Sequence, residues 1–213
     1  MSPGVQGGGP RSDAARRPRA RKGDGERLRD EILRATEQLL IRTGDQNAVS
    51  VRAIAEAVGV TPPSIYLHFA DKNELIFAVS TEHFLALDAA IESAALTATD
   101  PMDELRVRGL AYVRFGIEHP EQYRILFMSR PSAVPEGWTP DTMLDNAAFS
   151  HHLEAVQRAF PSVADPYLVA IGFWASVHGV VSLRISQPDF PWPEVETLVD
   201  HMLATQARGI AAG

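Results

Sequence analysis

The sequence predicts an all-α protein of about nine helices, with a small N-terminal bundle followed by a larger one. Apolar residues recur every three to four positions along most of the 213 residues, which is the helical period. No stretch alternates between apolar and polar residues as a half-buried strand does. No Asn-Gly or Asp-Gly pair lies between two alternating stretches, where a hairpin turn would place it.

The composition excludes several classes of protein. The chain has no cysteine, so disulfide frameworks and thiolate metal sites are ruled out and a cytoplasmic location is expected. No apolar run approaches the ~20 residues of a membrane span, so no membrane partner is expected. The N-terminus is basic without the apolar segment of a secretory signal.

Charge is distributed unevenly along the chain. The net charge is −7, but residues 1–25 carry +4, residues 26–78 carry −2 and residues 79–213 carry −9. Residues 1–25 lack apolar periodicity and are rich in Gly, Pro and Arg, so they are predicted to be a disordered basic arm. The arm is either a solvated leader or, if the next segment binds DNA, a source of further phosphate contacts.

Two helices are predicted directly after the arm. The first runs from about Arg27 to Gly44 and has five inward residues at helical spacing: Ile32, Leu33, Thr36, Leu39 and Leu40. The second, over residues 51–57, has Ser50 as its N-cap and Gly59 as its terminator.

Two more helices follow within one short stretch. Thr61 is predicted to cap a helix that runs to about residue 68, with Pro62 at the first position, where a missing N–H costs nothing. Asp71 and Glu74 have capping-box spacing and open a long helix. The predicted apolar face of that long helix consists of Ile76, Val79, His83, Phe84, Leu87 and Ile91.

Five further helices are predicted beyond Asp100, over residues 101–118, 121–130, 139–160, 166–186 and 194–210. Proline-rich segments separate several of them. We therefore predict three parts: the arm 1–25, a small helical domain 26–70 and a larger one 71–213.

The two short helices fit helix-turn-helix geometry, because the linking EAVGVT contains a glycine for a tight crossing. Their shared core would be Ala53, Ile54, Val58, Val60 and Ile65. Six residues would then face outward, toward phosphates or base edges: Thr61, Pro62, Pro63, Ser64, Tyr66 and His68. Alternatively, this segment is a polar surface turn in which Tyr66 and Phe69 only fill the core.

The stretch SVRAIAEAVGVTPPSIYLHFADKNEL, within a region of similarity over residues 27–75, closely resembles the signature of the TetR family of bacterial transcriptional regulators. The resemblance implies that the first three helices bind DNA and that the long fourth helix leads to an effector-binding domain. It also implies a homodimer. Our prediction is a repressor that a small-molecule effector releases from a palindromic operator.

The resemblance also implies roles for individual residues. Base-facing positions fall on Pro62, Pro63 and Ser64, and Pro63 departs from the Gly or Ala that is frequent there. Phosphate contacts fall on Ser50, Arg52, Tyr66, His68 and Lys72. Two prolines leave few hydrogen-bonding side chains for base recognition, which favours apolar contacts, such as with a thymine methyl, and recognition of DNA shape.

In the C-terminal half, Trp174 and His178 are four residues apart and share a helix face. WASVHG resembles a C-terminal subgroup of the same family, named for its Trp, His and Gly. A mostly apolar effector pocket is expected among Phe84, Leu87, Tyr112, Phe115, Tyr123, Phe127, Phe149, His152, Trp174 and His178. Alternatively, these residues are ordinary core, and His178 a core or dimer-interface histidine.

The last two helices are the expected dimer interface, because the small residues Gly172, Ala175, Ser176 and Gly179 permit close approach.

An enzyme or metal protein is not expected, and no cofactor is predicted. His151 and His152 are adjacent and point about 100° apart on a helix, so they cannot easily share one metal ion. The chain has no H-E-x-x-H, P-loop, dinucleotide-type glycine motif or nucleophile elbow. The remaining alternative, a helical interaction protein without DNA binding, leaves the helix-turn-helix segment unexplained.

Overall fold

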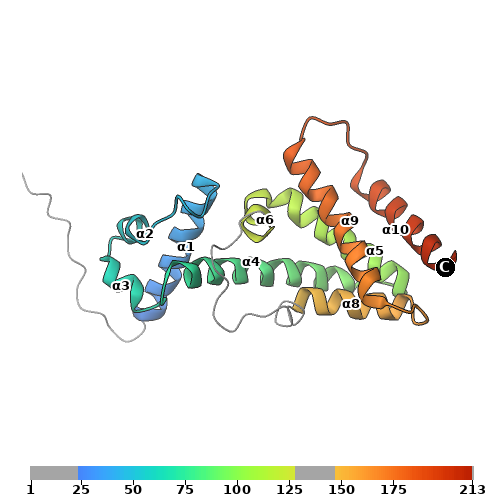
Figure 1. Ribbon diagram of the computed structural model, residues 1–213, viewed down its shortest axis with the longest axis horizontal. Coiled ribbons are helices and arrows are strands. Elements are labelled where there is room, and N and C mark those ends of the chain that lie inside the picture. Colours follow the sequence, from blue (N-terminus) through green and yellow to red (C-terminus); the bar gives the residue numbers. More distant parts are fainter. Residues whose placement is uncertain (1–23, 128–146, 213) are drawn as a thin grey trace, which may run out of the picture.

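The computed structural model describes residues 24–127 and 147–212 and confirms the predicted all-α class (Figure 1). These residues form nine helices and no strand. The helices are α1 (Asp24–Thr43), α2 (Val51–Val58), α3 (Pro62–Tyr66), α4 (Lys72–Ala95), α5 (Pro101–Glu118), α6 (Pro120–Phe127), α8 (Ala147–Ala159), α9 (Pro166–Ser186) and α10 (Val195–Ala212). Almost all of the predicted basic arm, the loop after Phe127 and the start of the helix predicted at 139–160 lie outside the described residues.

Helix α2 begins at the predicted Val51 and ends at Val58, one residue later than predicted, with the predicted Ser50 and Gly59 as its caps. Ser50 has extended backbone angles, and its Oγ accepts a hydrogen bond from the N–H of Ala53. Gly59 ends the helix with φ of 76°, in the left-handed region that disfavours any residue with a Cβ. Its N–H donates to carbonyls of the last turn. Local capping chemistry therefore fixes both ends of α2.

Helix α3 ends earlier than predicted, at Tyr66 instead of residue 68. The N–H groups of both His68 and Phe69 donate to the carbonyl of Ile65. The i→i+3 bond from His68 narrows the last turn, and the helix ends there. The chain then turns at once so that Phe69 reaches the core, where it is 2% exposed.

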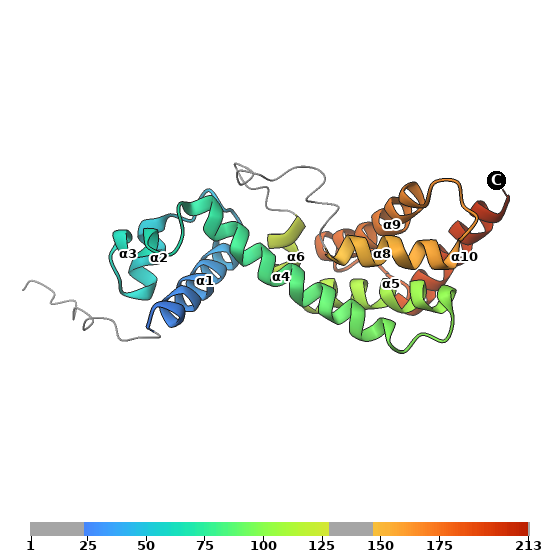
Figure 2. The same ribbon diagram turned by 90° about the horizontal axis from the view of Figure 1, so that it is seen from below.

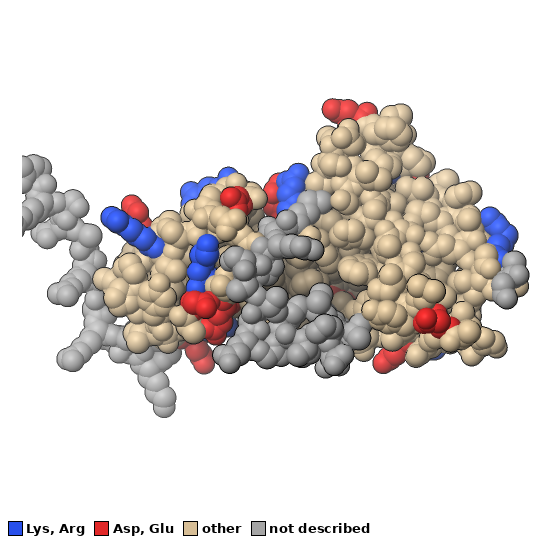
Figure 3. All heavy atoms as spheres, viewed as in Figure 1, with Lys and Arg blue, Asp and Glu red and all other residues tan. Residues whose placement is uncertain are grey.

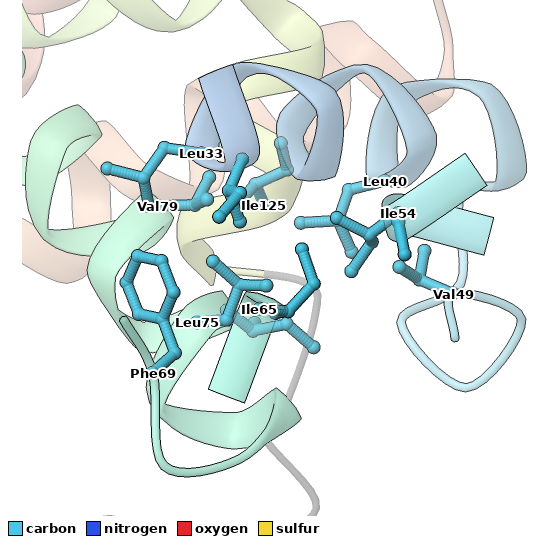
Figure 4. Close-up of a cluster of buried hydrophobic side chains, with 12 residues drawn as sticks. Leu33, Leu40, Val49, Ile54, Ile65, Phe69, Leu75, Val79 and Ile125 are labelled. Atoms are coloured by element: carbon cyan, nitrogen blue, oxygen red, sulfur yellow. The ribbon is translucent and has the colours of Figure 1, made fainter. Parts of the chain in front are cut away.

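A first hydrophobic core, shown in Figure 4, joins α1, α2, α3 and the start of α4. Its buried members are Ile32, Leu33, Leu40, Val49, Ile54, Ala55, Ile65, Phe69, Leu75, Ile76, Val79 and Ile125. The inward face predicted for α1 is confirmed at Ile32, Leu33 and Leu40. Ile125 was not foreseen here: it belongs to α6 and enters this core from the C-terminal half of the chain.

Helix α4 is the longest element and runs from the α1–α3 bundle into the C-terminal helices (Figures 1 and 2). Asp71 is its N-cap, as predicted, and its Oδ1 accepts from the N–H of Glu74 at 2.8 Å. The Glu74 carboxylate reaches back to the N–H of Ala70. Leu75, Ile76 and Val79 lie in the first core, whereas Leu87, about two turns after Val79, lies in the second.

Helix α5 is central to the C-terminal helices and packs against α4, α6, α8, α9 and α10. A second core gathers on it, with buried residues Leu87, Leu110, Tyr112, Val113, Phe115, Tyr123, Val180, Val181 and Val199. Helices α5 and α9 lie close together at Gly116, where a Cβ would lie 2.3 Å from Cγ1 of Val181. A third core, around Leu105, Ala155, Val156, Ala170 and Phe173, holds α8 to α5 and α9.

Helix α9 departs from the expectation that no segment is long and apolar enough to cross a membrane. It has 21 residues and passes that test by length and composition. Core helices of soluble proteins pass the same test, and α9 packs on α5, α8 and α10. Only 22% of its apolar window is fully buried, however; most of its other residues are half-buried, and one face, which includes Leu168, Gly172 and Leu183, is exposed.

Candidate DNA-binding surface and ligand site

The residues predicted to meet DNA lie around α3, at the end of the molecule farthest from α10 (Figure 1). Ile65 points into the first core and is 1% exposed. Around it, Thr61, Pro62, Pro63 and Tyr66 are exposed, and Ser64 and His68 are half-buried. Four of the six predicted outward residues are therefore exposed, and the other two are half-buried.

The paired prolines change the cap of this helix. Thr61 occupies the N-cap position with extended backbone angles, as predicted, but its side chain makes no capping hydrogen bond. Pro63 has no N–H to donate, and the N–H of Ser64 donates to the Thr61 carbonyl. The Thr61 hydroxyl pairs instead with the Ser64 hydroxyl, 3.1 Å away.

The predicted phosphate-binding residues occupy three positions around α3. Ser50 and Arg52 are exposed at the start of α2. The Lys72 ammonium donates one hydrogen bond to the Gln46 carbonyl at 3.1 Å. An ammonium has three N–H donors, so two further donors could reach a phosphate. The His68 ring lies close to the beginning of α1: a Cβ placed on Gly25 would be 3.9 Å from Cε1 of His68. Their assignment to phosphate contacts stays a prediction.

Four polar side chains meet inside the second core; we call them the Tyr–His cluster, consisting of Tyr112, Tyr123, Trp174 and His178. The hydroxyl of Tyr123 lies 2.5 Å from Nδ1 of His178, and that of Tyr112 lies 3.1 Å from the same nitrogen. The Trp174 indole N–H donates to the Tyr112 hydroxyl at 3.3 Å. The Phe127 ring packs against all four members, at centroid distances of 4.8 to 6.4 Å.

Burial keeps the Tyr–His cluster uncharged near neutral pH. Desolvation raises the pKa of Tyr112 to about 12 and raises that of Tyr123 further. Desolvation also lowers the pKa of His178. A neutral His178 that accepts at Nδ1 carries its proton on Nε2. A neutral polar group surrounded by aromatic rings is suited to orienting the polar end of a mostly apolar ligand.

The other predicted pocket residues divide between two cores. Phe84 meets Phe127 edge-on at 5.6 Å, and Leu87 and Phe115 are buried in the second core. Phe149 and His152 lie on α8, beside the third core. The His152 Nε2 pairs with the Ala170 carbonyl at 3.0 Å, and burial lowers its pKa. The Phe149 ring, 6.1 Å from that of Trp174, connects the two groups.

One group of possible metal ligands was not foreseen from sequence. Nδ1 of His151 lies 3.1 Å from carboxylate oxygens of both Asp88 and Glu92, and the three ligand atoms lie within 4.8 Å of one another. Arg108, which is 6% exposed, already donates to both oxygens of Glu92 and to Glu104. The ion pair with Arg108 therefore accounts for Glu92, while His151 and Asp88 lie at hydrogen-bonding distance from each other. It joins residues far apart in sequence, so no local motif announces it.

Helix α6 supplies a second feature without a sequence signal. Tyr123 belongs to the Tyr–His cluster and is fully buried, and Ile125, two residues later, is 4% exposed in the first core. Two residues along a helix point about 200° apart, so the two side chains leave opposite faces of α6. One short helix therefore touches both the candidate ligand site and the bundle that carries α3.

A helix-turn-helix bundle joined by a long helix to a further group of helices is the architecture of a helix-turn-helix DNA-binding regulator. A model of bacterial regulatory proteins of the tetR family matches residues 32–79, and a model of tetracyclin repressor-like C-terminal domains matches residues 105–206. The chain belongs to the TetR family of DNA-binding transcriptional regulators.

Individual relatives agree with this assignment. The chain is 35% identical over 100 residues to the HTH-type transcriptional activator FasR of Mycolicibacterium smegmatis, a match that spans 46% of this chain and 45% of FasR. A structure of a protein of unknown function from Rhodococcus sp. RHA1 superimposes with a TM-score of 0.71 at 25% identity, over 86% of this chain and 95% of that one. A TetR family regulator from Marinobacter aquaeolei VT8 shares the fold, with a TM-score of 0.68 at 22% identity over 86% and 97%.

Proposed function

We propose that this regulator is a homodimeric repressor that leaves a palindromic operator when a small molecule binds beside the Tyr–His cluster. The observation that carries this proposal is the double role of α6. A ligand that displaces Tyr123 from His178 shifts the helix that also places Ile125 in the first core. The ligand then favours whichever arrangement of α3 suits its own binding, by as much as its affinities for the two arrangements differ.

Helix α4 offers a second connection between the same two regions. Its first two turns carry Leu75, Ile76 and Val79 into the first core, and Leu87 reaches the second. A helix transmits a tilt along its length because its backbone hydrogen bonds keep it stiff. In a dimer, a small tilt of α4 would change the distance between the two α3 helices, which must match about 34 Å or a multiple of it.

The proposed dimer interface is the outward face of α9 together with α10. Tyr167, Leu168 and Leu183 are exposed on α9, and so are the small residues Gly172 and Ala175. The face of the C-terminal helices seen in Figure 3 is largely free of Lys, Arg, Asp and Glu, which lie mainly at its margins. A second copy of the chain would remove this apolar surface from water. Sedimentation analysis should give a dimer, and Ala175→Arg should give a monomer.

DNA binding is tested with duplexes from the chain's own upstream region, by fluorescence anisotropy at several salt concentrations. Binding should strengthen as salt is lowered, because each neutralised phosphate releases a counterion. Lack of binding at low salt would leave the helical interaction protein as the better interpretation. The regulator would act in the cytoplasm, where its operator lies.

The direction of regulation needs its own assay, since FasR is named as an activator. A promoter containing the bound duplex is fused to a reporter and compared with and without the regulator. Repression predicts higher reporter output when the regulator is absent. Lower output would assign activation while leaving DNA binding intact.

A further inference from the structure

The outermost ridge of α3 is apolar. Successive residues of a helix turn by about 100°, so residues two before and two after Ile65 project opposite its buried side chain. These residues are Pro63 and Leu67. Leu67 is 84% exposed, although it directly follows the last residue of the helix and is a large apolar side chain. It was absent from the residues that sequence analysis assigned to DNA.

The side chains beside this ridge offer few hydrogen bonds to bases. Thr61 and Ser64 are engaged with each other at 3.1 Å. Pro62 and Pro63 have neither a side-chain donor nor a backbone N–H. A single exposed leucine is common on protein surfaces, but here Leu67 and Pro63 lie opposite buried Ile65, on the outer side of the helix proposed to enter the major groove.

We infer that this regulator recognises thymine C5-methyl groups in the major groove through Pro63 and Leu67, with Leu67 as a specificity-determining residue. The methyl of thymine is the only apolar group that a normal base pair presents in that groove. Contact between it and Leu67 would remove apolar surface of both partners from water. The inference rests on the proposed DNA-binding function and specifies the chemical feature of the operator that the protein selects.

The test compares two versions of one upstream duplex, amplified with dTTP or with dUTP. Uracil pairs like thymine and lacks only the methyl group. Full-length protein should bind the uracil duplex more weakly, by about fourfold for each contacted methyl. Leu67→Ser should bind the thymine duplex more weakly and show a smaller ratio of thymine to uracil affinity than the unchanged protein.

The matched control is Leu96→Ser. Leu96 is 88% exposed just after the end of α4, so it resembles Leu67 in size, exposure and position at a helix end but lies far from α3 in the chain. This variant should keep the full thymine-to-uracil ratio. Equal affinity of the unchanged protein for both duplexes, or an unchanged ratio in Leu67→Ser, overturns the methyl inference while leaving DNA binding in place. Failure to bind either duplex overturns the proposed function as well.

Discussion

The two ends of this molecule are built on different physical terms. The first core contains almost only aliphatic side chains and one phenylalanine, and its helices begin and end with local caps such as Ser50 and Gly59. The second core encloses the four-membered Tyr–His cluster, and nearby the buried Arg108 pairs with carboxylates from two helices. The first core is apolar, and the polar residues predicted to bind DNA lie on the surface around it. The second core contains polar side chains whose pKa values are shifted by burial.

This difference explains why the two ends suit different tasks. Few polar side chains are buried with the first core, and Thr36 among them donates to the Ile32 carbonyl, so the packing beneath α3 should depend little on pH near neutrality. A polar cluster inside a core has hydrogen bonds that a ligand can replace, and any replacement left incomplete costs free energy. Four predictions test this contrast, from the largest expected effect to the smallest.

The first prediction concerns the aliphatic core. Ile65→Ala removes a side chain that is 1% exposed and leaves a cavity, so the free energy of unfolding should fall by about 2–5 kcal/mol. Urea denaturation measures this loss. Leu67→Ala, on the exposed side of the same turn, should stay within about 0.5 kcal/mol of the unchanged protein. Equal losses in the two variants would mean that Ile65 does not anchor α3.

The second prediction concerns the contact between α5 and α9 at Gly116. A Cβ at Gly116 would lie 2.3 Å from Val181, on a well-packed helix interface, so Gly116→Ala should cost about 1–3 kcal/mol. Adding Val181→Ala should recover part of that loss by making room. As a control, Gly209→Ala on α10 meets nothing within 4 Å and should not destabilise. If Gly116→Ala left the free energy of unfolding unchanged, α5 and α9 would have to separate easily.

The same contrast governs what sequence can predict. Caps and prolines are local, so the bounds of α5 at Pro101 and Glu118 and of α9 at Pro166 and Ser186 match the prediction. The fold class and the family follow from such signals together with the helix-turn-helix motif. The end of α3 was misplaced because two N–H groups compete for the one carbonyl of Ile65, which no residue type announces.

Contacts between distant segments were the part that sequence could not supply. Trp174 and His178 were predicted to share a face, but their meeting with Tyr112 and Tyr123 depends on how three helices pack. The entry of Ile125 into the first core, 46 residues after Val79, has no periodic signature within α6. Likewise, Arg108 pairs with Glu104, four residues earlier on its own helix, but only the fold brings it to Glu92 of α4.

The third prediction concerns the Tyr–His cluster. Tyr123→Phe removes the hydroxyl nearest to His178 Nδ1, but the Tyr112 hydroxyl remains 3.1 Å from that nitrogen, so the loss should be only about 1 kcal/mol. Combining it with Tyr112→Phe leaves the Trp174 N–H and His178 Nδ1 without these partners. The double variant should therefore lose more than the sum of the two single losses, as measured by urea denaturation. Simple additivity would show that the hydroxyls act independently.

The fourth and smallest effect is a dependence of stability on pH that arises mainly from the polar end of the molecule. Burial lowers the pKa of His178 and His152 in the folded protein, whereas in the unfolded chain each has its ordinary pKa near 6.5. Below that pH the unfolded state binds protons first, so stability should fall as the pH decreases from 7.5 to 5.5. Above it both states are neutral at these residues, and stability should be level.

His83 complicates this contrast, because it lies on α4 facing α1, with Nε2 3.2 Å from Glu37, and burial lowers its pKa too. The nearby Glu37 and Glu82 carboxylates oppose that shift, whereas desolvation is the only resolved cause for His178. Urea midpoints of His178→Gln and His83→Gln, each measured at both pH values, separate the contributions. His178→Gln should reduce the pH dependence more than His83→Gln does. A larger effect of His83→Gln would mean that most of the pH dependence arises where α4 meets α1, beside the first core. The contrast between a pH-insensitive first core and a pH-sensitive second core would then be wrong.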